Sequence, residues 1–191
     1  MALDFVERVK GFLLNPVESF NKYKNEEFGE AFKFYLVLVV ISSILTALVS
    51  SLGMGAYMGA VPGFGGAGLG IAMIAGLFIF MLVACILGLF IGSAIVHLFV
   101  IILGGKQGFI KTVMAMIYSS TPSMLFSWIP LIGILAGLWA LVLEVLALRE
   151  IQEMSTAKAV LAIILPVIII VILVMALAAF FVIAAVSTMG L

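Results

Sequence analysis

IAMIAGLFIFMLVACILGLFIGSAIVHLFVIIL, residues 71–103, contains no Asp, Glu, Lys or Arg and decides the fold class. A helix needs roughly 20 apolar residues to cross a bilayer, so this run can span a membrane as one long, tilted helix. Over the whole chain, 66% of residues are hydrophobic and 9% are charged, against roughly 45–50% and 25% in an average soluble domain. A domain of this size cannot bury so much apolar surface. The sequence therefore predicts an all-α, polytopic (multi-pass) membrane protein.

This composition also excludes several classes of protein. A disordered chain or a nucleic-acid binder with a basic surface would carry far more charge, whereas here nine Lys/Arg balance nine Asp/Glu. The single cysteine, Cys85, allows neither a disulfide nor a CxxC motif and is interpreted as a small buried apolar residue. The one His, one Cys and one carboxylate within the spans form no zinc-ligand motif such as CxxC, so a zinc site is not expected. We therefore expect no metal, no cofactor and no catalytic residues.

The remaining apolar sequence divides into further spans. Residues 34–52 and 159–191 are also free of charge, and residues 112–148 contain only Glu144. The stretch 112–148 is too long for one span. The Ser-Trp-Ile-Pro sequence at 127–130 interrupts it, because proline removes a helical hydrogen bond. We predict a tight turn at 127–130. For each of the two long uncharged runs, 71–103 and 159–191, we predict one long helix. The transmembrane domain, residues 34–191, then has five spans, at about 34–52, 77–103, 109–127, 131–148 and 160–187.

The positions of the positive residues predict the orientation. With five spans, all nine Lys and Arg fall on one side: in residues 1–33, at Lys106 in the connection between the second and third spans with Lys111 just after it, and in the connection that holds Arg149 and Lys158. The glycine-rich segment 53–70, the turn at 127–130 and the C-terminal tail contain none. Because positive residues concentrate in cytoplasmic connections, we expect the N-terminus inside, the C-terminus outside and 53–70 as an external loop.

Residues 1–33 are predicted to form cytoplasmic amphipathic helices. Asn15 followed by Pro16 is a helix start signal, with Asn at the cap and Pro in the first turn. These helices are expected to lie in the membrane interface or to dock under the bundle, and a surface for a protein partner is the alternative. Apolar residues recur at helical spacing before that signal: Leu3, Val6, Val9, Phe12 and Leu13.

Small residues four apart occur in two predicted spans. Ala84, Gly88 and Gly92 form one series, and Gly133 and Gly137 form another. Such spacing lets helix backbones approach closely in lipid. Packing within one chain is the favoured interpretation, and dimerisation is the alternative.

Two prolines mark candidate kinks or hinges within spans. Pro122 lies in the third span and Pro166 in the fifth. Hydroxyl side chains at Ser119, Ser120 and Thr121 can satisfy the backbone groups that Pro122 leaves free.

A GxGxxG pattern at Gly63, Gly65 and Gly68 resembles a dinucleotide fingerprint. That motif needs a preceding strand and a following helix in a βαβ unit, and the sequence predicts neither. We interpret the segment as part of the external loop.

Glu144 and His97 are the conspicuous polar residues within the spans, and an ionisable residue in a span suggests function. His97 lies about 10 Å and Glu144 about 7–8 Å from the inner ends of their spans, at 1.5 Å per residue. They could share one layer and pair, with Lys111 and Thr112 entering from the same side. The alternatives are an ion- or proton-linked polar cluster, a structural pair, and Glu144 reaching to the interface.

Ser93 lies four residues before His97, and such a pair could supply a nucleophile and its base. No carboxylate in that span could orient the imidazole. The favoured interpretation is a hydroxyl that bonds the backbone carbonyl four residues back.

The order and spacing of several residues resemble the Yip-domain family, membrane proteins named for interaction with Ypt/Rab GTPases. The early Asn15-Pro16 before an aromatic residue also resembles its short prokaryotic members. The matching residues are His97, Gly104-Gly105-Lys106, Phe109, Thr112, Tyr118-Ser119, Pro122, Pro130, Gly133, Trp139, Leu148, Glu150, Lys158-Ala159 and Pro166.

This resemblance implies a five-span bundle with a cytoplasmic N-terminus, and for eukaryotic members a role in vesicle trafficking through small GTPases. The chain departs from those members, because it lacks the long N-terminal region and the Asp-Leu-Tyr-Gly-Pro-type motif. That departure counts against a small GTPase as partner. We expect a non-enzymatic protein of a prokaryotic plasma membrane that organises the membrane or binds a membrane protein or a second copy. A small ion- or proton-linked transporter that uses the Glu144 and His97 pair is the alternative.

Overall fold

A computed structural model describes residues 2–51, 71–129 and 131–189, which contain helices and connections but no strand. The all-α prediction is therefore confirmed for the part of the chain that is described. The predicted loop at 53–70, with its GxGxxG pattern, and Pro130 lie outside the described residues. The helices are α1 (Ala2–Leu14), α2 (Pro16–Tyr23), α3 (Phe28–Ser51), α4 (Ile71–Ile102), α5 (Phe109–Ser119), α6 (Thr121–Phe126), α7 (Ile132–Ile151) and α8 (Thr156–Met189).

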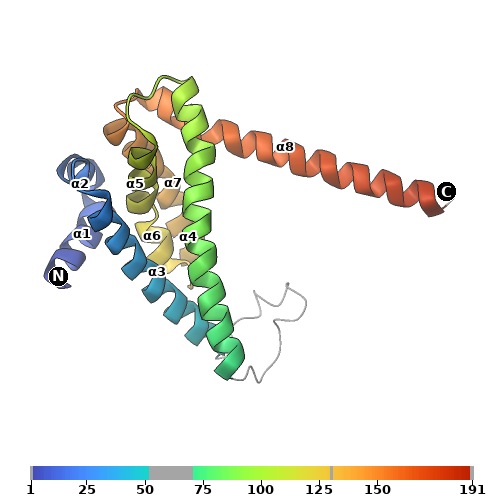
Figure 1. Cartoon of the computed structure of the whole chain (residues 1–191), viewed down its shortest axis with the longest axis horizontal. Helices are drawn as coiled ribbons and strands as arrows, with labels where there is room; N and C mark the ends of the chain where they lie inside the picture. The colour runs from blue at the N-terminus through green and yellow to red at the C-terminus, as the bar shows by residue number, and fades with distance from the viewer. Residues whose placement is uncertain (1, 52–70, 130, 190–191) are drawn as a thin grey trace.

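The short helix α5 lies at the centre of the bundle. It packs against α3, α4 and α7, and most of its side chains are buried. Helices α5, α6 and α7 form a hairpin, which α3 and α4 flank and which the N-terminal helices α1 and α2 cover at one end (Figure 1). Helix α8 begins beside the end of α4, packs on α4 and α7, and then runs away from the bundle (Figure 1).

Four helices are long and apolar enough to cross a membrane: Phe28–Thr46 in α3, Phe78–Ile102 in α4, Ile132–Ile151 in α7 and Thr156–Phe181 in α8. The sequence predicts one long helix for each of the uncharged runs 71–103 and 159–191. This prediction is confirmed, because α4 and α8 are both continuous. The predicted third span, 109–127, is instead divided into α5 and α6, neither of which is long enough alone. The count of five spans is therefore not confirmed.

The division between α5 and α6 has a clear chemical cause. Pro122 has no backbone N–H, so it cannot bond the carbonyl of Tyr118 as a helical residue would. The hydroxyl of Thr121 donates to that carbonyl instead, at 2.7 Å. The hydroxyls of Ser119 and Ser120 also donate to carbonyls one turn back, as predicted for these three residues. The backbone can therefore change direction within the bundle and leave none of these carbonyls unbonded.

The turn between α6 and α7 agrees with the prediction at 127–130. The indole of Trp128 donates to the carbonyl of Leu125 at 2.7 Å, and Leu131 adopts a positive φ of 66°. A Cβ on Gly133 would lie 2.8 Å from the carbonyl oxygen of Ser127. Glycine at 133 therefore allows the first turn of α7 to lie close against the preceding connection.

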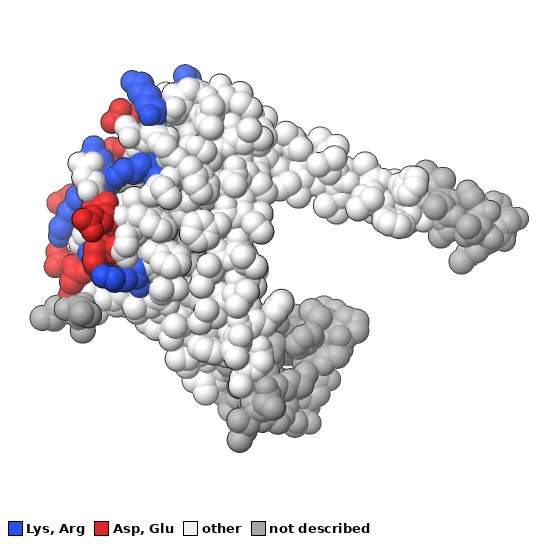
Figure 2. All heavy atoms as spheres, in the orientation of Figure 1, with Lys and Arg blue, Asp and Glu red and all other residues white. Residues whose placement is uncertain are grey.

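Charged side chains gather at one end of the molecule (Figure 2). They lie over α1, α2 and the neighbouring helix ends, whereas the visible surface of α8 and of the rest of α4 is uncharged (Figure 2). Since charge is costly within the hydrocarbon region, this distribution separates an end suited to water from a body suited to lipid.

Candidate functional site

The two N-terminal helices, named the N-terminal cap here (α1 and α2), dock on the bundle through aromatic side chains. Phe12 is fully buried, and its ring stacks on that of Tyr118 in α5 at a centroid distance of 4.7 Å. The ring centroids of Phe20 and Phe34 lie 5.3 Å and 6.0 Å from that of Phe12. Burial of several aromatic side chains contributes strongly to the stability of a fold. The cap is therefore an integral part of the bundle.

A partly buried ion pair reinforces this docking. Arg8 in α1 donates to the carboxylate of Glu26 at 2.9 Å, and the hydroxyl of Tyr118 donates to the same oxygen. The guanidinium also lies 4.6 Å from the ring centroid of Tyr23 and bonds Asp4. Burial alone would lower the pKa of Arg8, but the charges of Glu26 and Asp4 outweigh it and raise that pKa. Arg8 therefore stays charged at every physiological pH.

Two polar contacts tie the cap region to the helices behind it. The ammonium of Lys111, at the start of α5, donates to the backbone carbonyl of Lys24. The amide of Asn21 donates to the carboxylate of Glu150, near the end of α7, at 2.9 Å. The cap thus contacts residues far away in the sequence on two different helices.

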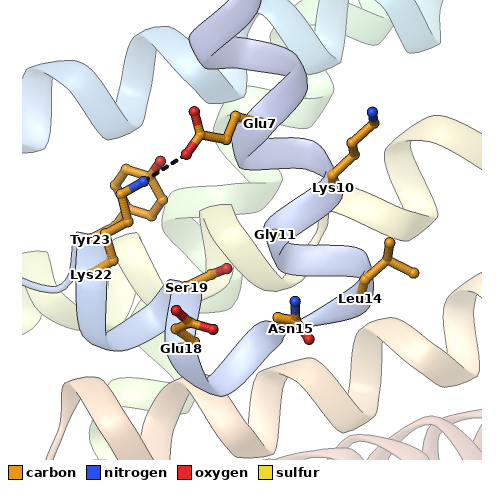
Figure 3. A pocket seen from close by; sticks show the side chains of 9 residues that line it. All are labelled: Glu7, Lys10, Gly11, Leu14, Asn15, Glu18, Ser19, Lys22 and Tyr23. Atoms are coloured by element: carbon orange, nitrogen blue, oxygen red, sulfur yellow. Dashed lines mark hydrogen bonds and ion pairs between the residues drawn. The ribbon is translucent and has the colours of Figure 1, made fainter.

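An open cleft of about 280 Å³ lies between α1 and α2 (Figure 3). Lys22 and Glu7 form an ion pair of 2.9 Å across its rim (Figure 3). A Cβ on Gly11 would meet the hydroxyl of Ser19 at 2.5 Å, so glycine lets the two helices approach closely. The helix start predicted at Asn15-Pro16 is confirmed, although the Asn15 side chain makes no capping hydrogen bond.

A second polar cluster, named the polar hub here (His97, Gln107, Gly108, Thr112 and Gln152), joins α4, α5 and α7 beside the cap. The fully buried side chain of Gln152 donates to the hydroxyl of Thr112 at 2.8 Å and to the carbonyl of Gly108 at 3.3 Å. Its own carbonyl oxygen accepts from the backbone N–H of Gln107 at 3.0 Å. One amide side chain therefore satisfies three groups of the α4–α5 connection.

His97 completes the polar hub. Its Nδ1 lies 2.7 Å from the hydroxyl of Thr112, and its ring packs edge-on against Phe109. Because the Thr112 oxygen already accepts from Gln152, its proton is free to be donated to Nδ1. The Thr112 hydroxyl therefore links His97 and Gln152 in one hydrogen-bonded chain.

The polar cluster predicted from the sequence forms only in part. The structure brings His97 and Thr112 together, whereas Lys111 turns to the N-terminal cap and Glu144 makes no hydrogen bond or ion pair with any described residue. His97 therefore bonds Thr112 and not Glu144. No signal in the sequence marks Gln152, because a single Gln near Arg149 at the end of a span looks like an ordinary surface residue.

Ser93 is fully buried, and its hydroxyl has no hydrogen-bond partner among the described residues. The expected bond to the backbone carbonyl four residues back is therefore wrong. Ser93 lies on the buried face of α4, where its small side chain fits into the packing.

The predicted small-residue series lie mostly away from other helices. An added Cβ at Gly88, Gly92 or Gly137 would meet nothing within 4 Å, and Ala84 is exposed. Close packing within the chain is therefore not formed at these positions by the described residues. Gly133 differs because it packs against the α6–α7 connection.

The two remaining predicted residues, Pro166 and Cys85, do not belong to either polar cluster. Pro166 is buried inside α8, which continues through it as one helix. Cys85 is half-buried, and its backbone carbonyl accepts the hydroxyl of Tyr35 at 2.9 Å. No group of three or more His, Cys, Asp and Glu side chains that could hold a metal ion occurs in the described part of the chain.

An all-helical bundle with four helices able to cross a bilayer and charge at one end defines a polytopic α-helical membrane protein. Within that class, the model of the Yip1 domain family matches residues 10–186, so the chain belongs to this family. The resemblance inferred from the motif residues is thereby confirmed. No curated protein and no solved structure was found to match the chain.

Proposed function

We propose that the chain is a non-enzymatic membrane protein that organises the membrane or binds a partner through its charged end. The observation that carries this proposal is the N-terminal cap, which aromatic contacts and the partly buried Arg8–Glu26 pair fix on the bundle. A docked cap holds the charged surface in one shape, and such pre-organisation reduces the entropy cost of binding. A link to trafficking rests on family membership alone.

The proposed topology has five crossings, with the N-terminus in the cytoplasm and the C-terminus outside. Helices α5 and α6 together make the additional, broken crossing, and α7 returns to the charged end. In support, the backbone N–H of Lys106 donates to the carbonyl of Gln152 at 3.3 Å, so the α4–α5 and α7–α8 connections lie side by side. Both connections hold Lys or Arg, as cytoplasmic connections do. A plasma membrane of a prokaryotic cell is the proposed location.

The N-terminal cap also offers apolar surface outside the spans. Leu14 is 75% exposed, and Val6 and Val17 are exposed as well. These side chains offer a partner apolar area that the fold itself leaves uncovered. Lipid is the partner of the spans, and we propose a membrane protein or a second copy of this chain as the partner of the cap.

Transport has no comparable support. A proton- or ion-linked mechanism through the predicted pair would need Glu144 and His97 in one site, and His97 bonds Thr112 instead. The buried centre is filled by Phe12, Tyr118 and their neighbours.

Accessibility of introduced cysteines tests the topology. In a Cys85→Ala background, we expect Ser127→Cys to react with an impermeant thiol reagent added outside intact cells. Glu153→Cys should react only after the membrane is permeabilised. Labelling of both positions from the same side would refute the five-crossing arrangement.

Photocrosslinking tests the partner. A benzophenone amino acid at Leu14 should yield a discrete crosslinked protein band in cells, whereas the same group at Ile169, in the exposed apolar part of α8, should crosslink mainly lipid. The partner proposal fails if Leu14 yields no band above the level of Ile169.

A further inference from the structure

The turn between α4 and α5 is held by hydrogen bonds and carries one lysine, and a second lysine, from α8, lies over it. Gly104, with φ of 84°, ends α4, and the N–H of Gly105 donates to the carbonyl of Val100 at 2.8 Å. This closure is typical of a Schellman motif, which favours glycine at the positive φ. The polar hub holds the rest of the turn, since Gln152 bonds Lys106 and Gln107. The position from which the Lys106 side chain leaves the backbone is therefore fixed.

Lys158 approaches the same turn from α8. A Cβ on Gly104 would lie 3.5 Å from its ammonium nitrogen, so this side chain lies over the glycine turn. Lys106 and Lys158 are both exposed, and neither forms an ion pair with a carboxylate among the described residues. The turn thus carries two positive charges without a counter-charge in contact.

The position of Lys158 adds to the positive potential. It lies in the first turn of α8, where the helix dipole is positive and a cation is unfavourable. Glu153 is the carboxylate of the adjoining connection, is exposed, and does not pair with either lysine. The turn therefore attracts an anion.

Apolar side chains next to the lysines indicate what kind of anion fits. Ile102 is 68% exposed at the end of α4, Ile110 is exposed at the start of α5, and Leu161 is exposed in the second turn of α8. A free anion would gain nothing from these side chains, but the acyl chains of a lipid would cover them. The backbone N–H groups of Gly104–Gln107 are all bonded within the protein, so recognition depends on the ammonium groups.

We propose that Lys106 and Lys158 bind the phosphate of an anionic phospholipid in the cytoplasmic leaflet, with its acyl chains along Ile102 and Leu161. This site rests on the proposed topology for its leaflet, although its residues and ligand do not depend on it. The lipid would join α4, α5 and α8 at their charged ends.

Native mass spectrometry of the purified full-length protein in detergent tests the site. Phosphatidylglycerol and phosphatidylcholine with identical acyl chains are titrated separately. The wild type should prefer phosphatidylglycerol, and Lys106→Gln/Lys158→Gln should weaken its binding about thirtyfold, as expected for two lysines near a lipid surface. Glu153→Gln should strengthen it about fivefold, because one nearby negative charge is removed.

A matched control separates a site from general attraction. Lys10→Gln/Lys24→Gln removes the same charge from the N-terminal cap, and its affinity should stay within about twofold of the wild type. Unchanged melting temperatures will show that both double variants fold. An equal loss in both double variants, no preference between the two lipids, or displacement of the lipid by excess inorganic phosphate overturns the proposal. None of these outcomes bears on the sidedness measured by cysteine labelling, so failure of the site and failure of the topology can be told apart.

Discussion

The N-terminal cap and residues 167–181 of α8 differ most in how they meet the rest of the protein. The cap buries Phe12 and Phe20 completely and pairs Arg8 with Glu26. Every residue from 167 to 181 is exposed, although this segment is almost entirely apolar. Thus the charged end gains its stability from protein contacts, whereas distal α8 depends on lipid. Among the four helices that could cross a membrane, the one of highest mean hydropathy is therefore exposed along its whole distal part.

Removal of one aromatic ring tests this contrast most severely. Phe12→Ala should destabilise the docked cap by about 3–5 kcal/mol, the usual cost of deleting a buried phenyl ring. Hydrogen exchange of α1 and α2 in detergent will report the loss of protection. Phe180→Ala is the matched control, because its ring is 65% exposed, and it should leave exchange in the bundle unchanged. Equal effects of the two changes would remove the distinction between the two regions.

The polar hub should come next in size. Gln152→Ala leaves the hydroxyl of Thr112 and the N–H of Gln107 with fewer partners in a buried site, which costs about 1–3 kcal/mol. Thermal unfolding in detergent measures the loss. Gln107→Ala is the control of the same residue type, since only the backbone of Gln107 bonds the hub. A similar loss from both variants would contradict the role assigned to the Gln152 side chain.

The partly buried ion pair of Arg8 and Glu26 should contribute less than the polar hub. Glu26→Gln weakens the bonds to Arg8 and Tyr118, with an expected cost of about 1–2 kcal/mol. Glu7→Gln alters the exposed pair with Lys22 and should cost less than about 1 kcal/mol. Exchange rates of the α1 amides, measured in both variants, give the ranking. The reverse order would show that burial does not decide which pair matters.

Glu144→Gln should have the smallest effect. Glu144 has no polar partner among the described residues. The free energy of unfolding of the variant should therefore lie within about 0.5 kcal/mol of that of the wild type. The same variant in liposomes should show the proton flux of the wild type. A large loss of stability, or a flux that the change abolishes, would return Glu144 to the centre of the mechanism.

The sequence predicted those features that depend on length and charge alone. The long helices α4 and α8 followed from runs without charge, and the division of α5 from α6 accords with the signal at Pro122. Gln152 and the cap contacts were not predictable, because they join residues distant in the sequence through side chains that look like surface residues. Glu144 misled for the converse reason: a carboxylate in a span is conspicuous in the sequence, whether or not the fold gives it a partner.

The polar hub also has a consequence for synthesis of the chain. Gly108 and Thr112 bond a side chain that follows them by 44 and 40 positions. A ribosome releases α5 well before Gln152, so these groups of the turn and of α5 lack their Gln152 partner until the end of α7 has been synthesised. The local bonds of Gly104 and Gly105 can form earlier, whereas the bonds that tie the turn to α7 form only after α7 is complete.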